Sequence, residues 1–88
     1  MVAVKVEHGD FDVIDALYEA AQWFHPLGPI AEPVDESVEP FDGTKVVLRV
    51  FFTIELSAFD FVSYVLAEGC KVTLLEVPFD SKLDEIVF

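Results

Sequence analysis

Basic residues are scarce in this sequence. Only 5 of its 88 residues are Lys or Arg, against 17 Asp and Glu, so the formal net charge at pH 7 is −12. Proteins bind nucleic acids and anionic membranes largely through Lys and Arg. The composition therefore argues against direct binding of the chain to nucleic acid or to a membrane.

Cysteine and long apolar runs are scarce as well. The single cysteine, Cys70, cannot form an internal disulfide, and we expect it to be a buried thiol at the start of a strand. The longest nearly apolar stretch, residues 46–54, is interrupted by Arg49 and is about half as long as a membrane span. Residues 1–7 lack the basic and apolar segments of a signal peptide. We therefore expect a cytoplasmic protein.

The sequence also lacks recognisable catalytic motifs. It has no Gly-rich phosphate loop, nucleophile elbow or spaced set of His and Cys, so we expect no catalytic residues and no cofactor. Glu7, His8, Asp10 and Asp12 carry groups that bind divalent cations. A turn followed by a helix N-cap already explains both aspartates, and we expect no metal site there.

Apolar residues, in contrast, are abundant. They make up 53% of the chain and include nine Phe, which is ample material for a core and excludes a disordered acidic tail. A chain of this length suffices for one domain with a small core. We expect one compact domain over residues 1–88, with an irregular tail over residues 79–88.

Hydrophobic periodicity predicts the order of the elements. Period-2 alternation is typical of strands, and apolar residues at i, i+3, i+4 and i+7 are typical of helices. The expected elements are a strand over 2–7, a helix from Asp10 or Asp12 to His25, a strand over 45–55, a helix from a capping box at 57–60 to Gly69, and a strand over 71–77.

The segment between the first helix and the second of these strands is a proline-rich acidic loop, residues 25–44. Val34, Glu36, Val38 and Pro40 alternate weakly, and Asp42-Gly43 is a hairpin-turn signal, so we expect an edge strand in this loop. The resulting order predicts an α+β, ferredoxin-like βαββαβ sandwich. Two helices would cover one face of a three- or four-stranded, mainly antiparallel sheet.

The apolar residues exceed what a two-layer domain easily covers. In the first helix, Trp23 widens the expected apolar stripe; in the second, the expected stripe is Ala58, Val62, Val65 and Leu66. One interpretation is a broad stripe in an aromatic-rich core. The other is a homodimer surface, for which the candidate residues are Val47, Phe51, Phe61 and Tyr64.

Charge is distributed unevenly along the chain. Residues 1–44 hold one basic and ten acidic side chains, whereas residues 45–88 hold four and seven. A solvated face, a halophile's surface and a docking surface for a basic partner all fit this pattern. For the docking surface, the candidate partner-binding residues are Asp10, Asp12, Asp15, Glu19, Glu32, Asp35, Glu36, Glu39 and Asp42.

Two resemblances bear on function. The element order, with Gly69-Cys70-Lys71-Val72 leading into the last strand, resembles ACT-type regulatory domains, which bind small molecules at helix–sheet interfaces of dimers. Those domains place a Pro-Gly turn before the first helix, where this chain has His8-Gly9-Asp10. In size and acidity the chain is similar to small phage-encoded inhibitors of host defence, several of which mimic nucleic acid with carboxylates.

We therefore expect a non-catalytic acidic protein that occupies a basic surface on a larger, nucleic-acid-binding protein, as a nucleic-acid-mimicking inhibitor does. The carboxylates would stand in for phosphates and pair with Lys or Arg of the partner. The alternative is an ACT-like or other ferredoxin-like module that binds a small molecule or assembles subunits.

Overall fold

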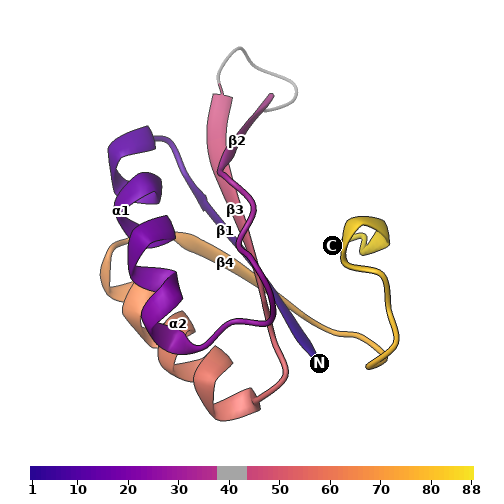
Figure 1. Cartoon of the computed structure of the whole chain (residues 1–88). Helices are drawn as coiled ribbons and strands as arrows, with labels where there is room; N and C mark the ends of the chain where they lie inside the picture. The colour runs from indigo at the N-terminus through magenta and orange to yellow at the C-terminus, as the bar shows by residue number, and fades with distance from the viewer. Residues whose placement is uncertain (38–43) are drawn as a thin grey trace.

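The computed structural model describes residues 1–37 and 44–88. These residues form one four-stranded antiparallel sheet and two α-helices (Figure 1). The elements are β1 (Val2–His8), α1 (Phe11–Ala21), β2 (Val34–Ser37), β3 (Thr44–Phe52), α2 (Glu55–Ala67) and β4 (Lys71–Glu76), with two 3-10 turns, η1 (Gln22–Phe24) and η2 (Leu83–Glu85).

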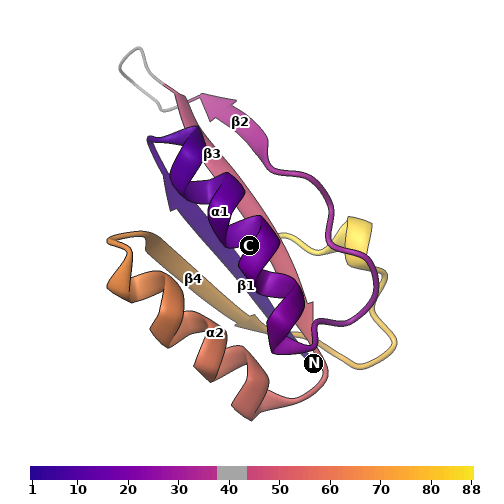
Figure 2. The same cartoon turned by 60° about the vertical axis from the view of Figure 1, so that its left-hand side comes forward.

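The strands are arranged in the order β2-β3-β1-β4, which is the ferredoxin-like order that the sequence predicts. Both helices lie on the same face of the sheet (Figure 2). The four residues of β2 form the edge strand expected in the proline-rich loop. The proposed hairpin turn at Asp42-Gly43, together with Val38 and Pro40, lies outside the described residues.

The alternation of β1 and β3 determines which side chains enter the core. Val4 pairs with Val50 and Val6 with Leu48, and all four side chains point toward the helices and are buried. The intervening residues, such as Lys5 and its partner Arg49, lie on the opposite face. We call this opposite side, which neither α1 nor α2 covers, the open face of the sheet.

The first helix begins where its capping chemistry predicts. Asp10 is the N-cap, and its carboxylate Oδ1 accepts a hydrogen bond of 2.9 Å from the backbone N–H of Asp12. After Ala21 the chain continues as η1 and leaves the helical conformation at His25, whose φ is +56°. The helix end predicted before Pro26 is thus confirmed.

The second helix begins earlier than predicted. β3 ends at Phe52, and the first helical hydrogen bond runs from the N–H of Ala58 to the carbonyl of Ile54. Ser57 therefore lies inside the first turn and caps nothing, so the predicted capping box is wrong. Glu55 in the first turn complements the helix dipole instead. Gly69 follows the helix with φ of +79°, as a C′ glycine does.

The predicted inward face of α2 is also partly wrong. The buried residues are Ala58, Phe61 and Val65, whereas Leu66 is exposed. The Phe61 ring packs 5.5 Å from that of Phe24 and 5.6 Å from that of Phe52, measured between ring centroids. An aromatic ring fills this space better than the smaller residues of the predicted stripe, and this contact determines the rotation of the helix.

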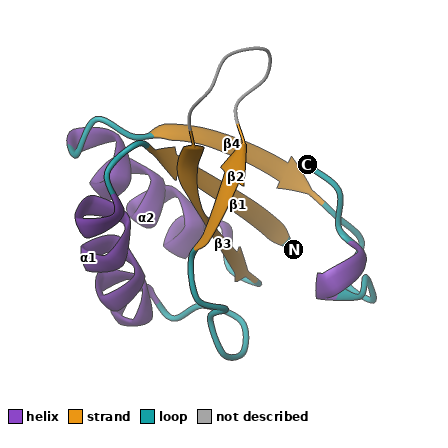
Figure 3. Ribbon diagram, turned by 90° about the horizontal axis from the view of Figure 1, so that it is seen from above, coloured by secondary structure: helices purple, strands orange, loops and turns teal. Residues whose placement is uncertain are grey.

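The C-terminal segment, residues 77–88, crosses to the open face of the sheet. In Figures 1 and 3 it lies on the side opposite the helices. Its start continues the sheet, because Val77 and Met1 exchange backbone hydrogen bonds. Its end approaches β3, where the Phe88 ring lies 6.5 Å from the ring of Phe51.

Candidate functional site

The outer face of α1 carries a row of carboxylates. Asp12, Asp15 and Glu19 are all exposed, at the i, i+3 and i+7 spacing that places them on one side of a helix. Trp23, in η1, continues the row and is 83% exposed. The sequence interpretation that assigned Trp23 to the apolar stripe is therefore wrong, since the side chain projects into solvent.

The loop before β2 supplies a further carboxylate beside this row. A cavity of about 260 Å³ separates α1 from the loop, and both Asp15 and Glu32 line it. Phe11, Tyr18 and Pro33 form the rest of its wall. Two acids and two aromatic rings around one cavity form a suitable environment for a cationic side chain, because ring faces and carboxylates both attract cations.

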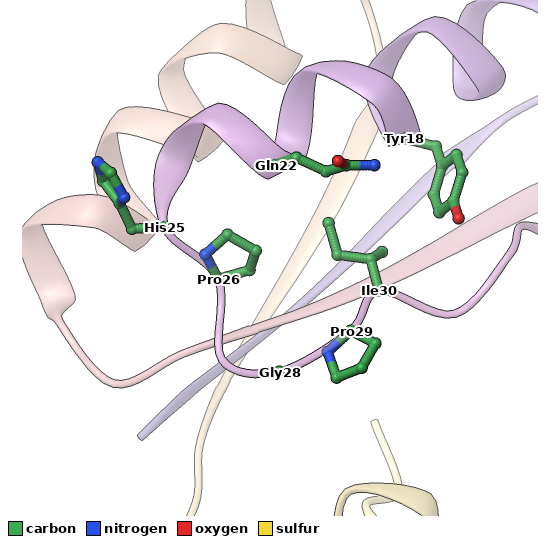
Figure 4. A pocket seen from close by; sticks show the side chains of 7 residues that line it. All are labelled: Tyr18, Gln22, His25, Pro26, Gly28, Pro29 and Ile30. Atoms are coloured by element: carbon green, nitrogen blue, oxygen red, sulfur yellow. The ribbon is translucent and has the colours of Figure 1, made fainter.

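A second cavity, of about 480 Å³, continues from the first along α1, and Tyr18 lines both. Figure 4 shows that Gln22 and Ile30 face each other across this space, while the ring of His25 points away from it. We call the two adjoining cavities the α1 groove. It runs between α1 and residues 26–33, beside the row of carboxylates.

Other acids of the first half of the chain have different surroundings. Asp35 lies opposite Val46, on the helix-bearing side of the exposed edge strand, so it remains near this surface. Asp10 is occupied as the N-cap of α1. Glu39 and Asp42 lie outside the described residues.

Glu36 does not join the row, which corrects its assignment to the acidic docking surface. It pairs with Lys45 across the β2–β3 ladder, and strand alternation places it on the open face. There its carboxylate accepts a hydrogen bond from Arg49 and lies 3.9 Å from the ammonium of Lys5. The hydrogen bond from Arg49 lowers the pKa of Glu36.

Glu7 anchors a cluster of lysines on the same open face. Its side chain is only 7% exposed, and its carboxylate oxygens lie 3.1 Å from the ammonium groups of Lys5 and Lys45 and 3.9 Å from that of Lys71. Burial alone would raise the pKa of Glu7, but the hydrogen bonds and charges of the first two lysines outweigh it and lower the pKa. Period-2 alternation places these side chains on one face of their strands, but only the pairing of the strands brings them together, so the sequence did not predict the cluster.

The charges are therefore segregated by layer. All five basic residues of the chain are described, and four of them lie on the open face, with Lys82 in the C-terminal segment. The helices α1 and α2 and the turn η1 contain no Lys or Arg. The charged side chains of these three elements are therefore all acidic, although α2 also exposes apolar residues such as Leu56 and Leu66.

The four candidate homodimer residues do not form one surface, which corrects the expectation from the sequence. Val47 and Phe51 lie on the open face, where Val47 is buried and Phe51 half-buried. Phe61 and Tyr64 belong to the helix layer instead. Phe61 is fully buried, and the exposed Tyr64 packs its ring 5.5 Å from that of Phe24.

The groups weighed as metal ligands or nucleophiles have structural surroundings. Within residues 1–37 and 44–88, no three His, Cys, Asp or Glu side chains are placed to hold a metal ion. His8 Nδ1 accepts a hydrogen bond from the backbone of Asp10. Cys70 is buried, and burial, reinforced by the charge of Glu68, raises the pKa of its thiol.

Both α-helices are far shorter than the roughly 20 residues that a bilayer span requires. The described part of the chain therefore contains no helix that is long and apolar enough to cross a membrane.

Comparison of the sequence with protein-family models and with curated proteins finds no match. Among solved structures, the chain is similar to SnoaB, a cofactor-independent oxygenase from Streptomyces nogalater. The two are 13% identical with a TM-score of 0.43, over 96% of this chain and 97% of that one. A likeness of this degree is too weak to transfer an activity to the chain.

Proposed function

We propose that the chain is a non-catalytic binding protein that uses the outer face of α1 and the α1 groove to occupy a basic surface on a larger protein. The observation that carries this proposal is the row of Asp12, Asp15 and Glu19 on a helix layer without any cation. Carboxylates that only kept the protein soluble would serve equally well if they were interspersed with Lys and Arg. A one-sign surface instead steers a partner of opposite charge toward it.

Aromatic residues beside the row supply anchors that charge alone does not. Trp23 is among the most exposed side chains of the molecule, and it shares a shallow cavity with Glu19 and Gln22. Exposed Trp residues that become buried on binding commonly contribute most of the affinity of an interface. We assign Trp23 as one anchor, and the cavity between Phe11, Asp15, Tyr18 and Glu32 as the receptor for a Lys or Arg of the partner.

We further propose that the basic surface of the partner protein normally binds nucleic acid. From Asp12 to Glu19 the helix rises about 10 Å, and one strand of DNA presents three or four phosphates over that length. Three carboxylates on α1 are thus similar in linear charge density to a nucleic-acid strand. The chain would act as a competitive inhibitor of such a protein, as phage-encoded mimics do against host defence.

Two charge-matched variants test the proposal. The α1-neutral variant carries Asp12→Asn, Asp15→Asn and Glu19→Gln, and the α2-neutral variant carries Glu55→Gln, Asp60→Asn and Glu68→Gln. Each removes three exposed acids, one of them from the first turn of its helix. We would use the wild-type chain and both variants as baits in lysate of the source organism, at low and at high salt.

We expect a protein that the wild-type and α2-neutral chains retain at low salt and the α1-neutral chain does not. Duplex or single-stranded nucleic acid added in excess should release it. Equal retention by the two variants would refute the role of α1, because the net charges of the variants are identical. Retention that nucleic acid leaves unchanged would refute the mimicry but not the acidic docking surface.

A further inference from the structure

A cavity of about 470 Å³ lies on the other side of the molecule, between the open face of the sheet and the C-terminal segment. Its floor is formed by Arg49 and Phe51 of β3, one wall by Pro29 of the loop after α1, and its roof by Leu83 and Ile86. Cavities of about 300–1,000 Å³ that are lined mainly by apolar groups are typical of small-molecule sites. Three segments distant in sequence thus converge on a space of that size.

The roof is weakly attached to the rest of the chain. Within the described residues after Pro78, the backbone hydrogen bonds are local, from Ser81 to Pro78 and from Glu85 to Lys82. The Phe88–Phe51 ring contact and the apolar side chains of the roof hold the segment against the sheet. The cavity is open to solvent and most of its lining is apolar, so a ligand that displaces water there would bury apolar side chains of the roof and of Phe51.

Two groups of opposite charge at the cavity determine the polarity of the ligand. Arg49 carries five N–H donors and uses one nitrogen to bind Glu36, which leaves donors for a ligand. Asp84 also lines the cavity, and no cation of the described chain lies within ion-pair distance of it. An anion would be attracted by Arg49 but repelled by Asp84 and Glu36. A cation would be attracted by Asp84 and Glu36 but repelled by Arg49. An uncharged ligand meets neither repulsion.

We propose that this cavity binds one small, uncharged, ring-containing organic molecule. The ring packs against Phe51, Leu83 and Ile86, a polar group of the molecule accepts a hydrogen bond from Arg49, and another donates one to Asp84. The chain's own C-terminal segment already covers this part of the open face, which favours a small molecule over a second copy of the chain as the occupant. The cavity shares Pro29 with the α1 groove, but none of the α1 carboxylates lines it.

A pair of fluorescent probes tests the proposal. Phenylnaphthylamine is uncharged and carries one N–H donor, and anilinonaphthalene sulfonate has the same rings with an added sulfonate. We expect phenylnaphthylamine to bind with one site per chain and at least about tenfold more tightly than the sulfonate. The α1-neutral variant should bind the probe as tightly as the wild type does. Failure of this proposal can therefore be distinguished from failure of the proposed docking function of α1.

Matched variants locate the binding. Ile86→Arg fills the cavity and should abolish probe binding, whereas Val87→Arg, at a neighbour that is 85% exposed and outside the cavity lining, should leave it unchanged. Asp84→Asn should weaken binding about threefold to tenfold, because a neutral amide oxygen accepts a weaker hydrogen bond than a carboxylate does, and Asp80→Asn should not. These aspartates are both exposed, so neither substitution threatens the fold.

Three results would overturn the proposal. The first is equal affinity of the chain for the two probes, and the second is equal probe binding by Ile86→Arg and Val87→Arg. The third is sedimentation that shows a dimer which neither binds the probe nor dissociates when the probe is added. The last result would assign the open face to a second copy of the chain.

Discussion

At the scale of single residues, Glu7 is the most constrained ionisable group in the described chain. Its carboxylate is nearly buried and is held by Lys5 and Lys45, with Lys71 nearby. A buried carboxylate is tolerated because charged partners replace its water. The sequence places these residues on one face of adjacent strands, but their meeting depends on the pairing of β1 with β3 and β4, which no local pattern specifies.

The lowered pKa of Glu7 predicts a particular dependence of stability on pH. A carboxyl whose pKa is lower in the folded state stabilises the fold above its unfolded pKa of about 4.3, and this contribution disappears as the pH falls through the folded pKa. We expect Glu7→Gln to cost about 1–3 kcal/mol at pH 7, because the lysines lose their charged partner.

Urea unfolding of the wild type and of Glu7→Gln, followed by circular dichroism between pH 7 and pH values below the folded pKa, measures this difference. The gap between the two proteins should narrow as the pH falls. A gap that is constant with pH would contradict the ion-pair explanation. Glu68→Gln, at an exposed site, serves as the control and should stay within about 0.5 kcal/mol of the wild type.

At the scale of secondary-structure elements, the sequence predicts the existence and order of helices and strands better than their rotation. Asp10 begins α1 as predicted because a side-chain cap is a local signal. In α2, apolar residues occur on every side, with Leu56, Phe59 and Leu66 exposed, so several stripes fit the helical period equally well. Packing of Phe61 against Phe24 and Phe52, which are distant in sequence, decides among them. The exposure of Trp23 does not follow from the helical period for a similar reason, because it depends on the turn η1.

Two phenylalanines on α2 test this rotation. Phe61→Ala should destabilise the fold by about 3–5 kcal/mol, because the fully buried ring leaves a cavity in the core. Phe59→Ala, at a position that is 49% exposed, should cost about 1 kcal/mol or less. Denaturant unfolding of both variants measures the contrast.

Should Phe61→Ala fail to fold, the milder pair Phe61→Leu and Phe59→Leu preserves the comparison. Equal losses at the two positions would mean that α2 presents a different face to the sheet.

At the scale of the whole molecule, the separation of charge between the layers is what distinguishes this chain from an ordinary ferredoxin-like domain. The sequence shows an acidic first half and a less acidic second half. Folding converts that division into a helix layer without Lys or Arg and an open face with four cations, because β1 and β4 each contribute one cation to the open face and β3 contributes two. Glu7 and Glu36 form ion pairs with these cations on the open face, whereas Asp12, Asp15 and Glu19 have no cationic partner within the described chain.

This arrangement predicts that salt stabilises the protein. Like charges at i, i+3 and i+4 on a helix each cost about 0.2–0.5 kcal/mol, and the net charge of −12 adds repulsion over longer distances. Raising the salt concentration shortens the Debye length, so we expect the Tm to rise by about 5 °C between low and high salt. Calorimetry of the wild type and the α1-neutral variant measures the effect, which should be smaller in the variant. A Tm that falls with salt would mean that the ion pairs of the open face outweigh the repulsion in the helix layer.

The central claim is that α1, and no other acidic part of the chain, docks on a basic partner. Its most direct test is the association rate constant of the wild-type, α1-neutral and α2-neutral chains with the captured partner, measured by stopped flow across a salt series. We expect the α1-neutral variant to associate at least about tenfold more slowly at low salt and with a shallower salt dependence, while the α2-neutral variant behaves like the wild type. Identical rates and salt slopes for the two variants would contradict the claim.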